Sequence, residues 1–159
     1  MEARSTFDAL VLQICGTSGW RTDPDIVATH SRDWLGHTTE TANGVAFART
    51  TAEVAAIVQA CASHGVAIVP QGGNTGLCGG SLVSNGSRAI ILSLARMNRI
   101  MHIDADGLSA TVEAGVILQD LHKAVEKEAL QLSAADREAR SLHGSSRTGR
   151  PRPDRSEAG

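Results

Sequence analysis

One stretch decides the fold expected for this chain of 159 residues: Pro70-Gln71-Gly72-Gly73-Asn74-Thr75-Gly76-Leu77-Cys78-Gly79-Gly80-Ser81. Five of the nine residues from Gly72 to Gly80 are glycine, which permits positive φ angles and lets a ligand approach without a Cβ in the way. Free backbone N–H groups in such a loop form a concave nest for anionic oxygen, above all a phosphate. Asn74, Thr75 and Ser81 add side-chain donors. The loop is therefore predicted to bind a phosphate group.

The segments just before the loop have strand and helix patterns. Val66–Val69 is a short apolar, mostly β-branched run, which predicts a strand buried on both faces. The preceding helix is expected to begin at Thr50, which has capping-box spacing with Glu53, and to end at Gly65. Its apolar face is predicted to consist of Val54, Ile57, Val58 and Cys61.

The rest of the chain predicts further helices and strands. The first helix ends near Gly16 and has an apolar stripe of Phe7, Leu10, Val11 and Ile14. Residues 20–44 are mostly polar and irregular, with a turn or helix-start signal at Asp23-Pro24. After the Asn85-Gly86 turn, residues 89–94 predict a buried strand, and 100–104 with 108–112 predict a hairpin. A last helix carries Leu118, Leu121, His122, Val125 and Ala129 on one face. This order predicts an α+β fold with a mixed sheet.

Two common phosphate motifs are excluded. No lysine follows a glycine of the loop, so it is not a P-loop, and the adjacent Gly72 and Gly73 break the Rossmann pattern. A flexible surface turn, or a run of small residues for helix packing, is the structural alternative. The position directly after a strand favours a ligand loop.

Four motifs in order resemble the FAD-linked oxidase family, whose flavin domain is of the vanillyl-alcohol-oxidase or PCMH type. The likeness is greatest to the D-lactate, glycolate and D-2-hydroxyglutarate dehydrogenase branch, and runs from about Asp33 to Leu132. The motifs are Thr50–Val54, His64–Leu77, Leu92–Leu94 with Met97-Asn98, and Val112–Val116.

The resemblance implies the N-terminal subdomain of a PCMH-type FAD-binding domain, a small mixed sheet with flanking helices. It implies a helix and irregular lead-in over residues 1–45 and a partial FAD-binding domain over 46–132. In covalently flavinylated relatives a histidine stands where this chain has Asn74, so FAD is expected to be non-covalent. The residues expected to line FAD are Pro70, Gln71, Gly72, Gly73, Asn74, Thr75, Gly76, Leu77, Gly80 and Ser81.

Residues 133–159 depart from the family. They contain six arginines and Leu142 as the sole large aliphatic residue, so a disordered, out-of-frame tail is expected. The family's second glycine-rich segment, which holds the isoalloxazine, does not appear there, so no catalytic residue is assigned. The chain is then expected to be a fragment, inactive alone, of an oxidoreductase for a small D-2-hydroxy acid. The alternatives are a non-enzymatic truncated remnant, one half of a split flavoprotein, and a phosphate-binding module for another nucleotide.

Composition limits the partners and the location. A net charge of −2 and the lack of tyrosine argue against nucleic acid or an anionic membrane as partner. Three cysteines without a CxxC motif, no secretory signal and no bilayer-length apolar run predict a cytoplasmic protein. No metal-ligand spacing occurs among the six histidines, and Cys78 is expected to be a small space-filling residue. Self-association through an exposed sheet edge is expected.

Overall fold

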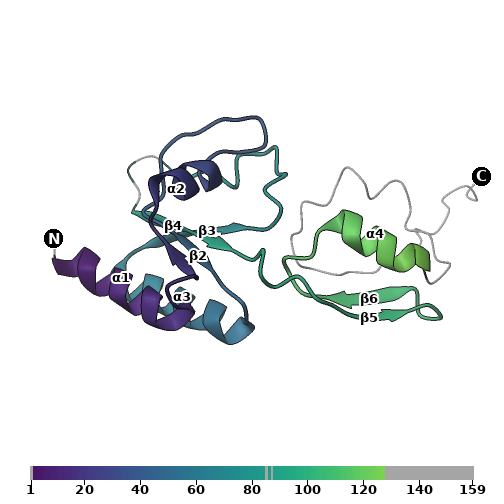
Figure 1. The fold of residues 1–159 in the computed structure, drawn as a ribbon. Helices are drawn as coiled ribbons and strands as arrows, with labels where there is room; N and C mark the ends of the chain where they lie inside the picture. Colours follow the sequence, from purple (N-terminus) through teal and green to yellow (C-terminus); the bar gives the residue numbers. More distant parts are fainter. Residues whose placement is uncertain (1, 85, 87, 128–159) are drawn as a thin grey trace, which may run out of the picture.

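A four-stranded mixed sheet forms the centre of the larger lobe in the computed structural model, which describes residues 2–84, 86 and 88–127 (Figure 1). The strands are β1 (Trp20–Arg21), β2 (Val45–Phe47), β3 (Ala67–Gln71) and β4 (Ala89–Ser93). They lie in the order β1-β2-β4-β3, with β2, β4 and β3 parallel and β1 antiparallel to β2. The carboxyl ends of the three parallel strands therefore share one edge, at Phe47, Ser93 and Gln71.

Helices cover both faces of this sheet (Figure 1). Helices α1 (Glu2–Cys15) and α3 (Thr51–His64) lie on one face, and α2 (Pro24–His30) lies on the other. The alternation of a strand sends Ile90 and Leu92 of β4 into the core beneath α1 and α3, whereas Ala89 and Ile91 pack toward α2. Strand β4 is consequently buried along its whole length, as its sequence predicts.

Helix α3 begins and ends as predicted. The Thr50 side chain accepts a hydrogen bond from the Glu53 N–H at 3.1 Å, and Gly65 ends the helix in the left-handed conformation with φ of 60°. The Glu53 carboxylate accepts from the backbone N–H of Arg49 at 2.8 Å, so the reciprocal half of the capping box is displaced by one residue.

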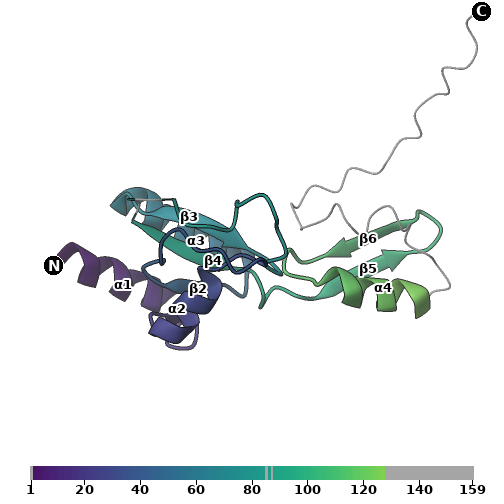
Figure 2. The same ribbon diagram turned by 90° about the horizontal axis from the view of Figure 1, so that it is seen from above.

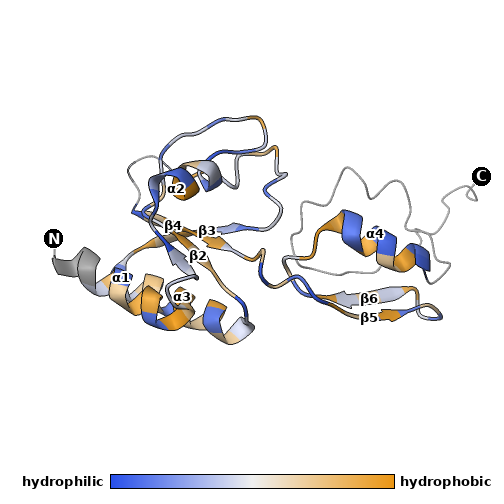
Figure 3. Ribbon diagram, in the orientation of Figure 1, coloured by the Kyte–Doolittle hydropathy of each residue, from blue (hydrophilic) through white to orange (hydrophobic). Residues whose placement is uncertain are grey.

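A smaller lobe follows β4. It contains the antiparallel hairpin β5 (Ile100–Asp104) and β6 (Ser109–Val112), which was predicted, and helix α4 (Leu118–Lys127) (Figure 2). In Figure 3, α4 has apolar and polar stripes, as an amphipathic helix does. Arg99 and Glu113 join the base of the hairpin: the Glu113 N–H donates to the Arg99 carbonyl oxygen, the Arg99 N–H donates to the Glu113 carboxylate, and the two side chains form an ion pair.

Several expectations need correction. The β3 strand is at the edge of the sheet, so Ala67 and Pro70 are exposed and it is not buried on both faces. Val58 is 43% exposed because the buried face of α3 passes through Ile57, Ala60 and Cys61 instead. The predicted hairpin forms a separate two-stranded sheet.

Residues 20–44, expected to be mostly irregular, include β1 and α2, and Asp23-Pro24 marks the start of α2. Ala129, Leu132 and the segment 133–159 lie outside the described residues. Among the described residues, no helix is long and apolar enough to cross a membrane.

Candidate functional site

The four sequence motifs meet at the carboxyl edge of the parallel strands. Thr50 begins α3 just after β2, the glycine-rich loop leaves β3, and Leu94 follows β4. The backbone N–H of Leu94 donates to the Gln71 carbonyl oxygen at 2.9 Å, and that of Gly115 donates to Met97 at 2.8 Å. In open α/β sheets this edge is where ligands bind.

The glycine-rich loop has unused backbone donors. None of the N–H groups from Gly72 to Gly80 donates a hydrogen bond to any residue that the structure describes. Asn74 and Gly79 adopt positive φ angles, of 53° and 75°, which re-aim successive peptide groups within the loop. Consecutive free N–H groups of this kind suit an anionic oxygen acceptor.

The glycines of the loop border open space. A Cβ built on Gly72, Gly79 or Gly80 would meet no atom within 4 Å. Two hollows lie against Gly72 and Gly73. One, of about 230 Å³, is lined by polar groups that include Thr29, His30, Gln71, Asn74 and Ser93. The other, of about 150 Å³, lies toward the smaller lobe and is lined by residues that include Asn98, Ile100, Val116, Ile117 and Asp120.

Two side chains of the loop have buried oxygens without a partner in the described part of the chain. These atoms are Oδ1 of Asn74 and Oγ of Ser81. A buried polar atom of this kind costs free energy unless a ligand or solvent pairs with it. The amide nitrogen of Asn74 is engaged, because it donates to the Arg32 carbonyl oxygen at 2.7 Å. A ligand that both accepts from N–H groups and donates to Oδ1 would satisfy the loop.

The segment after α2 lies beside the loop and holds it. The Gln71 amide donates to the His30 carbonyl oxygen at 2.9 Å, the Thr39 hydroxyl donates to Val83, and Gly86 N–H donates to Glu40 at 2.8 Å. Figures 1 and 2 show the two segments side by side above the sheet. The loop is thus fastened at its start, at Asn74 and near its end.

Within this segment, a buried carboxylate closes a turn. Asp33 accepts from the backbone N–H of His37 at 2.7 Å and lies 3.1 Å from its Nδ1. Burial raises the pKa of the Asp33 carboxyl, but the hydrogen bonds from the His37 backbone and ring outweigh it, and the net pKa lies below the usual value. Asp33 therefore remains ionised and keeps the turn closed.

The ten residues predicted to line FAD form one continuous stretch from β3 into the loop, apart from Cys78 and Gly79 between them. Pro70 belongs to β3 and is exposed, whereas Gln71 is buried and its amide holds α2. Leu77 is 64% exposed at the surface of the loop. Cys78 is exposed too, so the expectation that it fills space is wrong.

Sequence patterns did not single out the residues across the hollows from the loop. Ile117 and Asp120 line one hollow, and the Arg32 carbonyl and Trp34 lie in the segment that holds Asn74. Asn98, Gly115 and Val116, which also line that hollow, did carry a signal, since they belong to quoted motifs. The others are distant in sequence and follow no local pattern.

Comparison with known proteins gives consistent relatives. The profile of the FAD binding domain family matches residues 42–149. A probable D-2-hydroxyglutarate dehydrogenase, mitochondrial, from Oryza sativa subsp. indica is 38% identical over 115 residues, which cover 72% of this chain and 20% of the relative. Glycolate oxidase subunit GlcD from Bacillus subtilis (strain 168) is 43% identical over 82 residues, which cover 52% and 17%. The chain thus spans about a fifth of these relatives' length.

Solved structures share the fold. The 4-ethylphenol oxidase from Gulosibacter chungangensis has a TM-score of 0.71 and 23% identity, over 80% of this chain and 25% of that one. p-Cresol methylhydroxylase has a TM-score of 0.66 and 20% identity, over 82% and 26%. In both proteins the matching part is about a quarter of the molecule.

Proposed function

This chain belongs to the FAD-binding domain family, and we therefore propose that its glycine-rich loop binds the pyrophosphate of FAD. The proposal assigns the contact to residues 70–77, with Gly80 and Ser81. The observation that carries it is the coincidence, in one loop, of free backbone N–H groups with glycines that face open space.

The loop suits this ligand chemically. No charged side chain occurs from Pro70 to Ser81, so an anion would be held by backbone dipoles, as in a nest. The unpartnered oxygens of Asn74 and Ser81 can accept hydrogen bonds, and the hydroxyls of a ribose or ribityl chain are donors of that kind. The residues present therefore fit a dinucleotide better than a bare phosphate ion.

The flavin is non-covalent in this proposal. The residue at the tip of the loop is Asn74, whose amide is occupied with Arg32 and is not a nucleophile. Once bound, the flavin supplies two-electron redox chemistry, while the chain supplies binding and orientation. Flavin is therefore expected in the supernatant after acid precipitation of the loaded protein, and flavin retained in the pellet would contradict this assignment.

The reaction belongs to the same proposal. The relatives are named for D-2-hydroxyglutarate, D-lactate and glycolate, which favours a small D-2-hydroxy acid as the substrate class of the oxidoreductase to which this domain contributes. We assign no catalytic residue within the described part of the chain. The expectation is that this chain alone binds FAD without turnover.

Titration of the purified chain with FAD, FMN and ADP tests the cofactor. Flavin fluorescence and calorimetry are expected to show binding of FAD and ADP and weaker binding of FMN, because the pyrophosphate and the adenosine belong to the ligand. A preference for FMN, or affinity that does not depend on adenine, would contradict FAD as the cofactor.

A reducing location also forms part of the proposal. The three cysteines are free, and Cys15 and Cys61 are buried in the core as thiols. We place the protein in the cytoplasm on this ground, although several relatives are named as mitochondrial. Fractionation of cells that express the tagged chain would decide, and a signal confined to an organelle would contradict it.

A further inference from the structure

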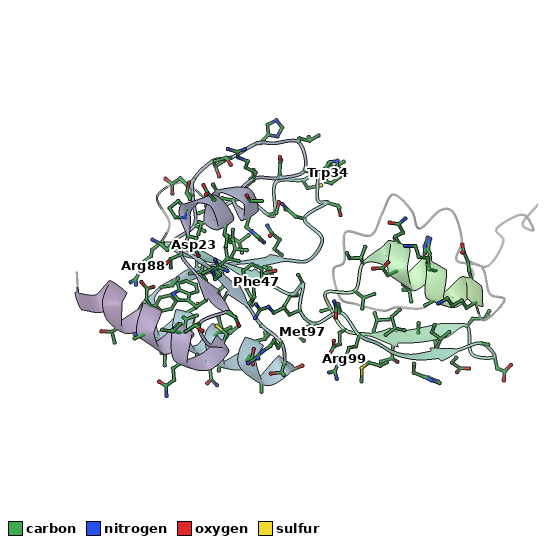
Figure 4. The ribbon with its side chains drawn as sticks, viewed as in Figure 1. Asp23, Trp34, Phe47, Arg88, Met97 and Arg99 are labelled. Atoms are coloured by element: carbon green, nitrogen blue, oxygen red, sulfur yellow. The ribbon has the colours of Figure 1, made fainter. Side chains whose placement is uncertain are left out.

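The segment beside the glycine-rich loop carries a tryptophan, Trp34, whose indole is exposed to solvent. Trp34 is 69% exposed, and its neighbour Leu35 is 60% exposed. Figure 4 shows Trp34 at the outer end of the segment that follows α2. The second tryptophan, Trp20, is buried at 7% exposure and packs edge-on against Phe7. Only Trp34 of the two therefore has a π face available to a ligand.

The segment that carries Trp34 is joined to the loop. The carbonyl of Arg32, two residues before it, accepts the hydrogen bond from Asn74. Asp33, between the two, is buried and hydrogen-bonded to His37, which follows Trp34 along the chain. Two residues of extended chain span at most about 7 Å, so the backbone of Trp34 lies within that reach of the Arg32 carbonyl that holds Asn74.

We propose that Trp34 stacks on the adenine ring of the bound dinucleotide. This inference rests on the proposed function, since the pyrophosphate in the nest fixes where the adenosine begins. An exposed indole is a suitable partner for a flat base, because offset stacking buries both π faces. The Asp33–His37 turn holds the backbone on both sides of Trp34 before the ligand binds, which lowers the entropy lost on binding.

The lining of one hollow suits the other ring of the dinucleotide. Toward the smaller lobe, the hollow of about 150 Å³ has the apolar walls Ile100, Val116 and Ile117. A reacting ring requires walls that exclude water, so that side suits the isoalloxazine. Trp34 lines neither hollow and its indole is exposed, which is sufficient for stacking on a ring that only needs to bind.

Affinity measurements on the full chain and its variants test this assignment. Trp34→Ala is expected to weaken FAD and ADP binding by about 5- to 150-fold, the range that ~1–3 kcal/mol of base stacking corresponds to. FMN binding, which involves no adenine, is expected to change less than twofold. Trp34→Phe should recover most of the loss, because it keeps a flat ring. The control Met101→Ala removes another exposed apolar side chain, from β5, and should leave all three affinities unchanged.

The outcomes separate the two proposals. If the wild type binds neither FAD nor ADP, the proposed function fails and this inference fails with it. If the wild type binds FAD, and Trp34→Ala binds FAD and ADP as tightly as the wild type does, this inference alone is overturned. An equal loss for FMN, FAD and ADP would also overturn it, because it would show that Trp34 supports the loop rather than the adenine. Circular dichroism of each variant confirms that the fold is retained.

Discussion

At the scale of single residues, two glycines of this site are required for opposite reasons. A Cβ at Gly72 would meet no atom within 4 Å, so the protein itself leaves room for a side chain there. A Cβ at Gly115 would collide with the Leu94 carbonyl and approach that of Met97, because the two segments pack closely. The fold thus explains glycine at position 115, whereas the described part of the chain leaves position 72 open for the ligand that we propose.

Gly72→Ala is expected to weaken FAD binding by about tenfold or more, corresponding to ~1.4 kcal/mol. The added methyl group would occupy the space where the pyrophosphate approaches the backbone. The free energy of unfolding should change by less than about 1 kcal/mol, because the site is open and its φ is not positive. Calorimetric titration and urea denaturation measure the two quantities.

Gly115→Ala is the matched control for that variant. It is expected to lower the free energy of unfolding by about 1–3 kcal/mol, since the backbone must move to relieve the collision. A Gly72→Ala protein that binds FAD normally would remove position 72 from the binding surface. Equal destabilisation in both variants would show that position 72 is structural as well.

At the scale of elements, the N-terminal cap of α3 fixes where this helix begins, at the carboxyl edge of the parallel strands. Thr50 lies shortly after the end of β2, and its hydroxyl accepts a hydrogen bond from the backbone N–H of Glu53. Thr50→Ala is expected to cost about 0.5–2 kcal/mol in urea denaturation, the usual contribution of such a cap. Thr51→Ala, one residue into the helix and exposed, is the control and should cost less. Equal effects would indicate that the hydroxyl of Thr50 does not act as a cap.

The ion pair between Arg99 and Glu113 stabilises the base of the hairpin in a pH-dependent way. Hydrogen bonds from the Arg99 side chain, and then from its backbone N–H, hold the pKa of the Glu113 carboxyl below its ordinary value. A carboxyl whose pKa is lower in the folded state stabilises the protein above the pKa of the unfolded state. This stabilisation is lost as the pH falls through the folded pKa.

Glu113→Gln should therefore lower stability near neutral pH and make the acid-side decline shallower than in the wild type. Denaturation at a series of pH values below neutrality measures both. Glu126→Gln, at an exposed glutamate of α4, should leave the pH profile as it is. A wild-type slope retained in Glu113→Gln would refute the role of this pair.

At the scale of the whole molecule, the two lobes meet at Met97, Arg99 and Gly115, where Figure 4 labels the first two. The hollow toward the smaller lobe is lined from both sides of this junction. The smaller lobe itself has a two-stranded sheet, whose outer edges have no strand partner among the described residues. Such a sheet is only marginally stable alone and its edges can pair with another chain.

Self-association through this sheet is accordingly expected. Sedimentation should show dimers or larger species whose proportion rises with concentration. Met101→Lys, which places a charge on the exposed surface of β5, should shift the distribution toward the monomer. A monodisperse wild-type monomer at high concentration would contradict the expectation.

The sequence predicted a structural feature well where neighbouring residues set that feature, and poorly where distant residues did. The cap at Thr50, the stop at Gly65 and the hairpin at residues 100–112 follow from neighbouring residues, and the structure confirms them. Strand β3 was misjudged because an apolar run is the same in sequence at the centre and at the edge of a sheet. Val58 was misjudged because the sheet, rather than the helix periodicity, selects which face of α3 is buried.

By itself, the sequence determined helices α1, α3 and α4, strand β4, the hairpin and a loop rich in glycine, because these depend on conformational preferences within a few residues. Only the tertiary structure decided that Arg32 accepts from Asn74, that Gly115 packs against Leu94, and that Trp34 is exposed. These contacts join segments far apart along the chain. Their geometry is set by strand order and core packing, for which no local pattern exists.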